Sequence, residues 1–319
     1  MPLRAASSAR HAALCFSESA SAAAAVAPAV PAVGSVSTHK ATHEQHRGTS
    51  CTGKYRATRE RLDYTWHSHY THERQALQDS IVDDFLAGGS PPSPRPWLVL
   101  TAGPMGAGKS YAMRWLHAAG AFPLDAFVVV DVDRIRDRLP ETPLLVQSNR
   151  ALAGTLTQVE CGFIAELIER EALAAARQIL VDGSLRDADW YARVIGRVRE
   201  EHPAYRIAIV LVTASRVRTF ERAARRAAVT GREVPRAVLD TALATVPSSF
   251  AALAPLVDYA AVIDNEQERA PRLAPPATLE TFAAVWRDIE RPKGATAAAA
   301  AAAVDCARDG AMHDVHDVR

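Results

Sequence analysis

The octapeptide Gly103-Pro104-Met105-Gly106-Ala107-Gly108-Lys109-Ser110 constrains the fold more than any other part of this 319-residue chain. It fits the pattern G-x-x-x-x-G-K-[ST] and lies between the apolar run Trp97–Leu100 and an apolar-faced stretch with Met113 and Leu116. In a strand–loop–helix unit, such glycines let successive backbone N–H groups point at a phosphate chain, and the helix N-terminus adds positive potential. Residues 103–110 are therefore predicted to bind a nucleoside triphosphate, with Lys109 on the β- and γ-phosphates and Ser110 on Mg²⁺.

From Trp97 onward, apolar runs of strand length alternate with helical stretches. The runs are Trp97–Leu100, Phe127–Val130, Gln178–Val181, Ile207–Val212 and Tyr259–Ile263. They are continuous rather than alternating, which is typical of strands buried on both faces of a parallel sheet. Helices are expected over 109–119, 156–177, 187–200, 215–230, 236–246 and 277–290. The pattern predicts an α/β P-loop NTPase fold with a doubly wound parallel five-stranded sheet.

Composition divides the chain into four segments. Residues 1–55, rich in Ala, Ser, Thr and His, are expected to be disordered or to form a targeting leader. Residues 56–92 are expected to form a helical extension, and 93–291 the α/β domain. The alanine-rich tail 292–319 is expected to be disordered. His67, His69 and His72 in the extension do not suggest zinc, because positions i and i+2 face different sides of a helix.

Charge and cysteine content narrow the function classes. The formal net charge of +1 argues against nucleic acid as a partner. No apolar run approaches the roughly 20 residues that a membrane helix needs, so a membrane-spanning protein is excluded at this stage. The 4 cysteines are scattered without metal-site spacing, which fits a reducing, intracellular compartment, cytoplasmic or organellar. A small-molecule acceptor is the expected partner, and the sequence does not identify a protein partner.

Carboxylates follow the second and third apolar runs. Asp131 and Asp133 come directly after Val130, where ligands of open α/β sheets bind. Asp133 is predicted to take the proton of an acceptor hydroxyl, with Asp131 as a neighbouring substrate-binding group. Asp182 follows the third run and is predicted to hold Mg²⁺, and Arg186 follows it on a short turn suited to an acceptor phosphate. The alternative for the aspartates is helix capping.

Arginines cluster after the fourth apolar run. The cluster comprises Arg222, Arg225, Arg226 and Arg232. Arginines on a closing helical lid neutralise the charge that develops during phosphoryl transfer. The alternative is a solvated helix face. No N-K-x-D base-recognition signature follows, which counts against a guanine-nucleotide switch.

Taken in order, these motifs resemble the zeta-toxin/UDP-N-acetylglucosamine kinase family. The resemblance rests on the P-loop, on VDVD with the following R, R and LPE (Val130–Glu141), on VDGSLRD (Val181–Asp187), and on the arginine block ending in TGREVP at Pro235. It covers about residues 96–265. It implies a Mg²⁺- and ATP-dependent kinase that phosphorylates a hydroxyl of a small acceptor; in the bacterial toxins, this is the 3′-hydroxyl of UDP-N-acetylglucosamine.

The resemblance also implies residue roles. Lys109 and Asp133 become catalytic, Asp182 the acidic residue near the metal, and Arg186 and Glu160 the acceptor-binding pair. Arg225 and Arg226 are expected to be catalytic lid arginines, and Arg222 and Arg232 to contact ATP, without a unique register. The toxins carry glutamate where this chain has Asp182 and threonine where it has Ser184, which puts metal coordination and acceptor choice in doubt. A polynucleotide 5′-hydroxyl kinase and a non-catalytic nucleotide-dependent interaction module remain alternatives.

Overall fold

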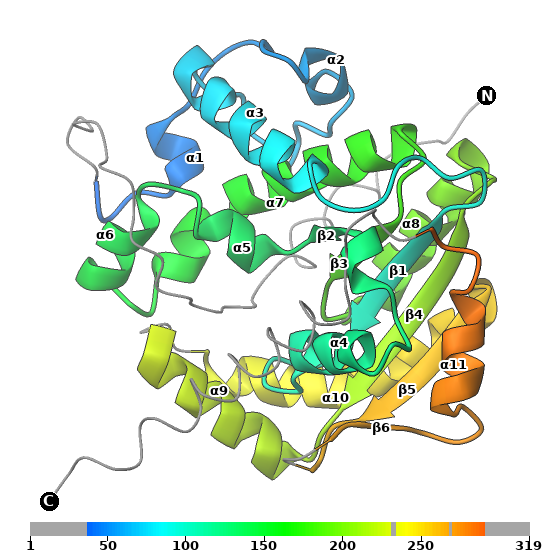
Figure 1. Ribbon diagram of the computed structural model, residues 1–319. Helices are drawn as coiled ribbons and strands as arrows, with labels where there is room; N and C mark the ends of the chain where they lie inside the picture. The colour runs from blue at the N-terminus through cyan, green and yellow to red at the C-terminus, as the bar shows by residue number, and fades with distance from the viewer. Residues whose placement is uncertain (1–36, 231–233, 268–269, 291–319) are drawn as a thin grey trace, which may run out of the picture.

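A mostly parallel β-sheet with helices on both faces forms the centre of the chain (Figure 1). The computed structural model describes residues 37–230, 234–267 and 270–290. Its strands are β1 Trp97–Ala102, β2 Val128–Val130, β3 Ile179–Asp182, β4 Arg206–Thr213, β5 Tyr259–Asp264 and β6 Arg272–Leu273. Its α-helices are α1 Thr42–Gln45, α2 Arg56–Arg59, α3 His72–Leu86, α4 Lys109–Ala118, α5 Val132–Arg136, α6 Thr142–Ser148, α7 Ala153–Ala174, α8 Ala188–Glu201, α9 Arg216–Thr230, α10 Arg236–Leu253 and α11 Leu279–Val285. Short 3₁₀ helices occupy Leu124–Ala126 and Ala254–Leu256.

The strand order is β2-β3-β1-β4-β5-β6. The first five strands are parallel, so the predicted α/β fold and its five apolar strands are confirmed. The sheet has one strand more than predicted, because β6 pairs antiparallel with β5 at the edge. With two residues, β6 is too short to give an apolar run in the sequence.

Both faces of the sheet are buried, which explains the uninterrupted apolar runs. In β1, Leu98 and Leu100 join the core beneath α7 and α8, whereas Trp97 and Val99 join the core beneath α4 and α11. Since successive strand residues point to opposite faces, a strand covered on both sides needs apolar residues at every position.

Helix α10 has a composition that the sequence expectation overlooked. The segment Arg236–Leu256 is long and apolar enough to cross a membrane by length and composition alone, since an 18-residue window within it has a mean hydropathy of 1.4. The expectation that no such segment exists is therefore corrected; the threonines and serines of α10 obscure an otherwise apolar run. Its Ala242, Val246 and Leu253 lie in the same core as Val194 and Val198 of α8.

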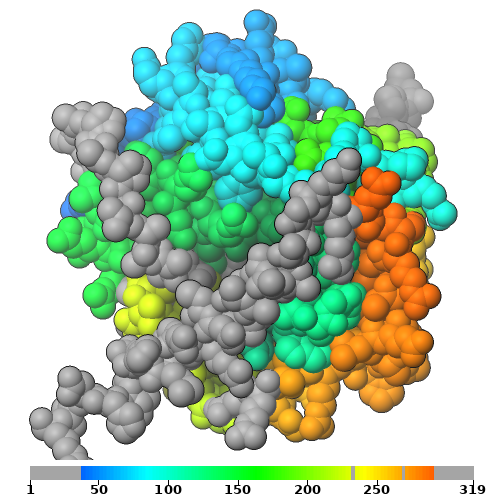
Figure 2. Space-filling model, viewed as in Figure 1, coloured from blue at the N-terminus to red at the C-terminus, as the bar shows by residue number. Residues whose placement is uncertain are grey.

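The N-terminal part packs on the α/β domain through α3 and α7. Ordered structure already begins within the predicted leader, because α1 and the segment up to Cys51 are tied to later residues. The rest of that leader, 1–36, and the predicted tail 292–319 lie outside the described residues. Within the extension 56–92, only α2 and α3 are helical. Leu62 and Tyr70, which lie between these two helices, are nevertheless buried. In Figure 2 the blue and cyan atoms of this part lie directly against the green atoms of α5 to α7.

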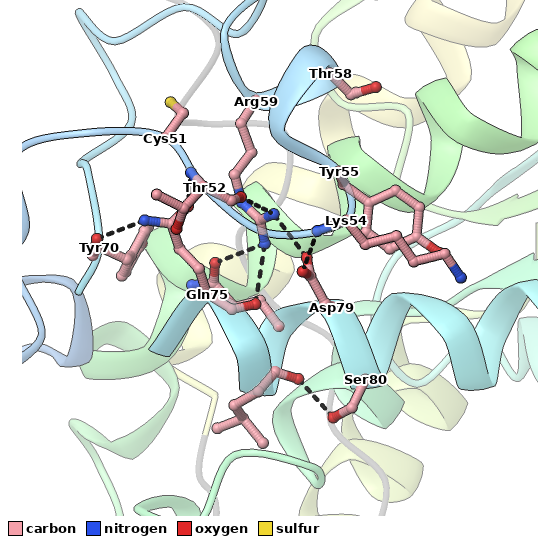
Figure 3. Close-up of polar contacts among 12 residues, drawn as sticks. Cys51, Thr52, Lys54, Tyr55, Thr58, Arg59, Tyr70, Gln75, Asp79 and Ser80 are labelled. Carbon is pink, nitrogen blue, oxygen red and sulfur yellow. Dashed lines mark hydrogen bonds and ion pairs between the residues drawn. The ribbon is translucent and has the colours of Figure 1, made fainter. Parts of the chain in front are cut away.

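Arg59 holds the turns of this N-terminal part together (Figure 3). Its side chain is 1% exposed, and its Nη1 donates to Asp79 Oδ1 at 2.6 Å and to the carbonyl of Thr52 at 3.1 Å. Its Nη2 donates to the carbonyl of Gln75 at 3.2 Å. One guanidinium thus joins α2, the 51–55 segment and α3, which fixes chain that has little regular structure of its own.

Candidate active site

The predicted site residues follow three adjacent strands. Because the order is β2-β3-β1, the carboxyl ends of these parallel strands bring Asp131 and Asp133, then Asp182, then Gly103 to one edge of the sheet. This is the edge at which open α/β sheets bind ligands.

The phosphate loop has the backbone that its glycines allow. Gly106 and Gly108 adopt φ values of 82° and 83°, in the left-handed region that side chains rarely adopt. Neighbouring atoms also leave no room for a side chain at either glycine. A Cβ on Gly106 would lie 2.2 Å from the carbonyl oxygen of Thr219, and one on Gly108 would lie 2.3 Å from Asn265 Nδ2. The loop is therefore packed between α9 and the segment after β5, and α4 begins directly at Lys109.

Lys109, Ser110 and Asp182 meet beside the loop. Lys109 is buried; its Nζ donates to the carbonyl of Gly103 at 3.1 Å and lies 3.9 Å from Asp182 Oδ1. Ser110 Oγ donates to Asp182 Oδ2 at 3.1 Å, and Thr101 Oγ1 donates to Oδ1 at 2.9 Å. A hydroxyl beside a carboxylate is an oxygen donor set that suits Mg²⁺, which takes few protein ligands and keeps water or phosphate as the others. The shorter Asp182 thus still reaches Ser110.

Asp131 caps α5. Its Oδ1 accepts hydrogen bonds from the backbone N–H of Asp133 at 2.8 Å and of Arg134 at 3.4 Å, so the capping alternative holds for this residue. Burial, followed by the charges of Asp182 and Asp133, raises the pKa of the Asp131 carboxyl to about 6. Asp131 therefore sits in the same carboxylate row, with one oxygen already committed to the helix.

Asp133 faces two arginines. It is 3% exposed, its Oδ1 pairs with Arg136 Nη1, and its Oδ2 lies 3.1 Å from Arg226 Nη2. Arg136 is itself fixed, because its Nε donates to Thr157 Oγ1 and its Nη2 to Gln158 Oε1, each at 2.8 Å. Asp133 is thus an oriented carboxylate at the β2 end of the row, with Asp182 between it and the phosphate loop.

The arginines of α9 differ in what their side chains contact. Arg226 contacts Asp133, and its burial lowers the pKa of the guanidinium while Asp133, Asp131 and Asp182 oppose that shift. Arg222 Nη1 lies 3.5 Å from the carbonyl of Ala107 in the phosphate loop. Arg225 is exposed, and no described contact joins it to the loop or to Asp133, so the structure does not place it in the site. Arg232 lies outside the described residues.

The turn after β3 carries the remaining predicted groups. Leu185 is fully buried with a φ of 60°, and it anchors a turn that holds Asp182 on one side and Arg186 on the other. Ser184 accepts a hydrogen bond from the N–H of Gly103 through its carbonyl, while its hydroxyl is buried without a partner among the described residues. Arg186 is half-buried, and its carbonyl accepts from Ser249 Oγ at 3.1 Å.

Glu160 is not at this site, which corrects the expectation that it binds the acceptor. It is 0% exposed, and its carboxylate accepts from Arg74 Nε at 2.6 Å, Arg74 Nη2 at 2.9 Å and Gln78 Nε2 at 2.8 Å. Arg74 also pairs with Glu141, so Glu160 belongs to a buried network between α3, α6 and α7. A single sequence shows no sign of this, because the partner lies 86 residues away.

Two groups at the site escaped sequence reasoning. Arg136 was open to detection, since it lies three residues after Asp133 on a helix. Asn265 was not: it follows β5, is 1% exposed, and donates from Nδ2 to the carbonyl of Ala107 at 2.7 Å, which supports the phosphate loop from behind.

Comparisons with known proteins agree with this geometry. The family described as Zeta toxin matches residues 82–270. A structure from the PezAT chromosomal toxin–antitoxin system of Streptococcus pneumoniae has a TM-score of 0.50 at 14% identity and covers 76% of this chain and 96% of its own. The AvrRxo1-ORF1:AvrRxo1-ORF2 structures with sulphate ions and with ATP have TM-scores of 0.53 and 0.52 at 15% identity, and each covers 81% of this chain and 84% of its own.

At these identities the solved structures share the fold alone, and no curated protein sequence matches the chain. The family match spans more than half of the chain and includes the phosphate loop, both aspartate turns and α9. The resemblance predicted from the motifs is confirmed: the chain belongs to the Zeta toxin family of P-loop kinases.

Proposed function

We propose that this protein transfers the γ-phosphoryl group of ATP to a hydroxyl of a small acceptor, with Asp133 as the base. The observation that carries the proposal is the row of groups set by the strand order β2-β3-β1, in which Asp133 and the phosphate loop flank the Ser110–Asp182 pair. A nucleotide sugar such as UDP-N-acetylglucosamine is the first acceptor to test, because of the family to which the chain belongs.

In this proposal the phosphate loop and Lys109 hold the triphosphate, and Ser110 with Asp182 would hold Mg²⁺. Bound Mg²⁺ would neutralise the phosphates and keep them in line with the acceptor. Asp133, oriented by Arg136, accepts the proton of the attacking hydroxyl. Arg226 lies beside Asp133 and stabilises negative charge on the transferring group.

The acceptor side is formed by the turn after β3. Arg186 follows Asp182 on this turn and would bind an anionic group of the acceptor, and the hydroxyl of Ser184, unpaired among the described residues, is available for a hydrogen bond to it.

Turnover with labelled ATP tests the proposal. The protein is incubated with Mg²⁺, ATP and a metabolite pool, and separately with UDP-N-acetylglucosamine, and phosphorylated products are identified. Asp133→Ala should lower transfer by about 10²–10⁴-fold and leave ATP binding largely intact. Lys109→Ala should weaken binding of the triphosphate.

The two variants separate the outcomes. Equal loss of binding and transfer in Asp133→Ala would show that Asp133 is structural. Tight ATP binding without turnover on any acceptor would contradict the kinase proposal and favour an interaction module. Normal turnover in Lys109→Ala would remove the assignment of the phosphate loop.

A further inference from the structure

Asn265 lies directly after β5, at the edge of the sheet that carries the phosphate loop. Its backbone N–H donates to the carbonyl of Thr213, the last residue of β4, at 2.8 Å, so the sheet holds its main chain. The residue is 1% exposed, and its Nδ2 donates to the carbonyl of Ala107 at 2.7 Å. A rigid part of the fold thus delivers one hydrogen bond to the middle of the phosphate loop.

The carbonyl that Asn265 binds belongs to the same peptide group as the N–H of Gly108. This peptide group is trans and planar, so its C=O and its N–H point in opposite directions. Because the buried amide draws the carbonyl of Ala107 toward the interior, the N–H of Gly108 points away from the interior. That N–H forms no hydrogen bond within the described part of the chain, whereas the N–H of Ala107 already donates to the carbonyl of Pro104 at 3.1 Å.

The N-terminus of α4 continues from this peptide group. α4 begins at Lys109 with Gly108 as its N-cap, and no side chain of the described residues caps it. The first N–H groups of a helix have no partner within the helix, and together they attract an anion. The N–H of Gly108 adds one donor to this set only if the peptide group keeps its orientation.

A second donor reaches the same carbonyl from α9. Arg222 Nη1 lies 3.5 Å from the carbonyl oxygen of Ala107, at the long limit of a hydrogen bond. An arginine beside a phosphate site can leave a carbonyl for a phosphate oxygen, which is the stronger acceptor. The bond from Asn265 is shorter and comes from the sheet. It therefore keeps the peptide group oriented whether or not Arg222 stays on the carbonyl.

The amide of Asn265 is not the side chain that stability alone favours at this position. Its Oδ1 is buried without a hydrogen-bond partner among the described residues. A buried acceptor that lacks a donor is destabilising, and a leucine of similar volume would remove it. The contribution of the amide is thus the bond from Nδ2, and that bond goes to the phosphate loop.

We propose that Asn265 is a positioning residue for phosphate binding, which directs the N–H of Gly108 to the triphosphate by holding the carbonyl of Ala107. The role rests on the proposed function, because it requires ATP to bind at residues 103–110. Asn265 acts through the peptide group and does not contact the nucleotide. The direction of a donor in the loop is therefore set by a residue more than 150 positions later in the sequence.

Calorimetry on the full chain with two probes, Mg²⁺-ATP and Mg²⁺-tripolyphosphate, tests this role. Tripolyphosphate has the phosphate chain without base or sugar. Asn265→Leu should weaken both probes by the same factor, about 10-fold or more, because the loop loses the bond that orients a phosphate donor. Asn265→Asp should be at least as weak at pH 9, where a carboxylate would face the carbonyl of Ala107. At pH 5 it should bind both probes more tightly than Asn265→Leu, because a protonated carboxyl can donate to that carbonyl.

Gln267→Leu is the matched control, since Gln267 is an exposed amide on the same segment that accepts from Arg272 at 3.0 Å. It should leave both affinities unchanged. Melting followed by circular dichroism separates the role from a structural one, because Asn265→Leu should keep or raise the melting temperature. A lowered melting temperature with unchanged affinities would overturn the proposal. So would a loss of affinity for ATP but not for tripolyphosphate, or equal binding by the two Asn265 variants at pH 5.

The same measurements keep this role apart from the kinase proposal. Full affinity for both probes in a folded Asn265→Leu protein would refute the role of Asn265 and leave the kinase proposal standing. Binding of ATP by wild type without transfer to any acceptor would do the reverse, provided that Asn265→Leu still weakens both probes. Failure of wild type to bind either probe would overturn both proposals.

Discussion

Arg74→Met tests whether the N-terminal part and the kinase fold form one cooperative unit. Arg74 donates from Nη1 and Nη2 to the two oxygens of Glu141 at 2.9 Å, and from Nε and Nη2 to Glu160 at 2.6 and 2.9 Å. Arg74 is 4% exposed, Glu141 1% and Glu160 0%. Methionine keeps most of the volume of the side chain but leaves two carboxylates buried without their cation.

The expected loss of unfolding free energy is about 3–5 kcal/mol, the usual result of removing one partner from a buried ion pair. His46 still reaches Glu141 and Gln78 still reaches Glu160, which favours the lower end. Arg138→Met is the matched control: Arg138 pairs with Asp84, both are 50% exposed, and its loss should cost about 1 kcal/mol or less. The control measures the effect of removing an arginine without uncovering a buried charge.

Urea unfolding followed by circular dichroism at pH 7 gives both values. We expect a single transition whose midpoint falls in Arg74→Met at an unchanged slope. Burial raises the pKa of Glu141, but hydrogen bonds from His46 and Arg74 outweigh it and lower the pKa to about 2. The lowered pKa means that ionised Glu141 stabilises the fold above pH 4.5 and that this contribution is lost as pH falls toward 2. The unfolding free energies of wild type and Arg74→Met should therefore converge in acid. A midpoint at pH 7 equal to that of Arg138→Met would refute the reasoning.

Three further predictions test the site. Asp131→Asn should raise the free energy of unfolding at pH 8 by about 1–3 kcal/mol in urea unfolding. Asparagine can replace aspartate as the cap of α5. Because the pKa of Asp131 is raised in the folded protein, its ionised carboxyl destabilises the fold as pH rises from about 4 through 6. A pH-independent difference would contradict this. Arg226→Gln should lower kcat by about 10²-fold or more and Arg225→Gln by less than about 3-fold; equal effects would count against the observed placement of α9. Gly106→Ala should abolish ATP binding in calorimetry, because its Cβ would lie 2.2 Å from the carbonyl oxygen of Thr219; retained affinity would show that the loop is not packed as described.

Much of the fold could be predicted because its signals are local. The five parallel strands are apolar at nearly every position, and the loop between β1 and α4 carries its function in eight consecutive residues. The placement of Asp133 and Asp182 beside the loop then follows from parallel strand order, since carboxyl ends of parallel strands share an edge. The short α5 and α6 and the two-residue β6 gave no comparable periodicity.

What could not be predicted depends on partners distant in sequence. Glu160 is an ordinary helical glutamate until Arg74, 86 residues earlier, meets it in the core. Leu62, Trp66 and Tyr70 have the spacing of a helix, yet no helix forms between Arg59 and His72, where hydrogen bonds of Arg59 tie the chain to the 51–55 segment and α3. The sequence predicts that the arginine cluster lies on a helical lid, but only the fold shows that Arg226 contacts Asp133 and that Arg225 is exposed.

The charge balance of the site is the reason we expect Arg226 to contribute more to phosphoryl transfer than the other arginines of α9. The carboxylates of Asp131, Asp133 and Asp182 lie in one row, and the cations of Lys109, Arg136 and Arg226 lie against it. Arg136 donates to Thr157 and Gln158 as well as pairing with Asp133, and Lys109 donates to the carbonyl of Gly103 inside the phosphate loop. Arg226 reaches Asp133 from α9 and has no second anchor of this kind among the described residues, so it can exchange Asp133 for phosphate. That exchange would release Asp133 to accept a proton at the moment when negative charge develops next to it.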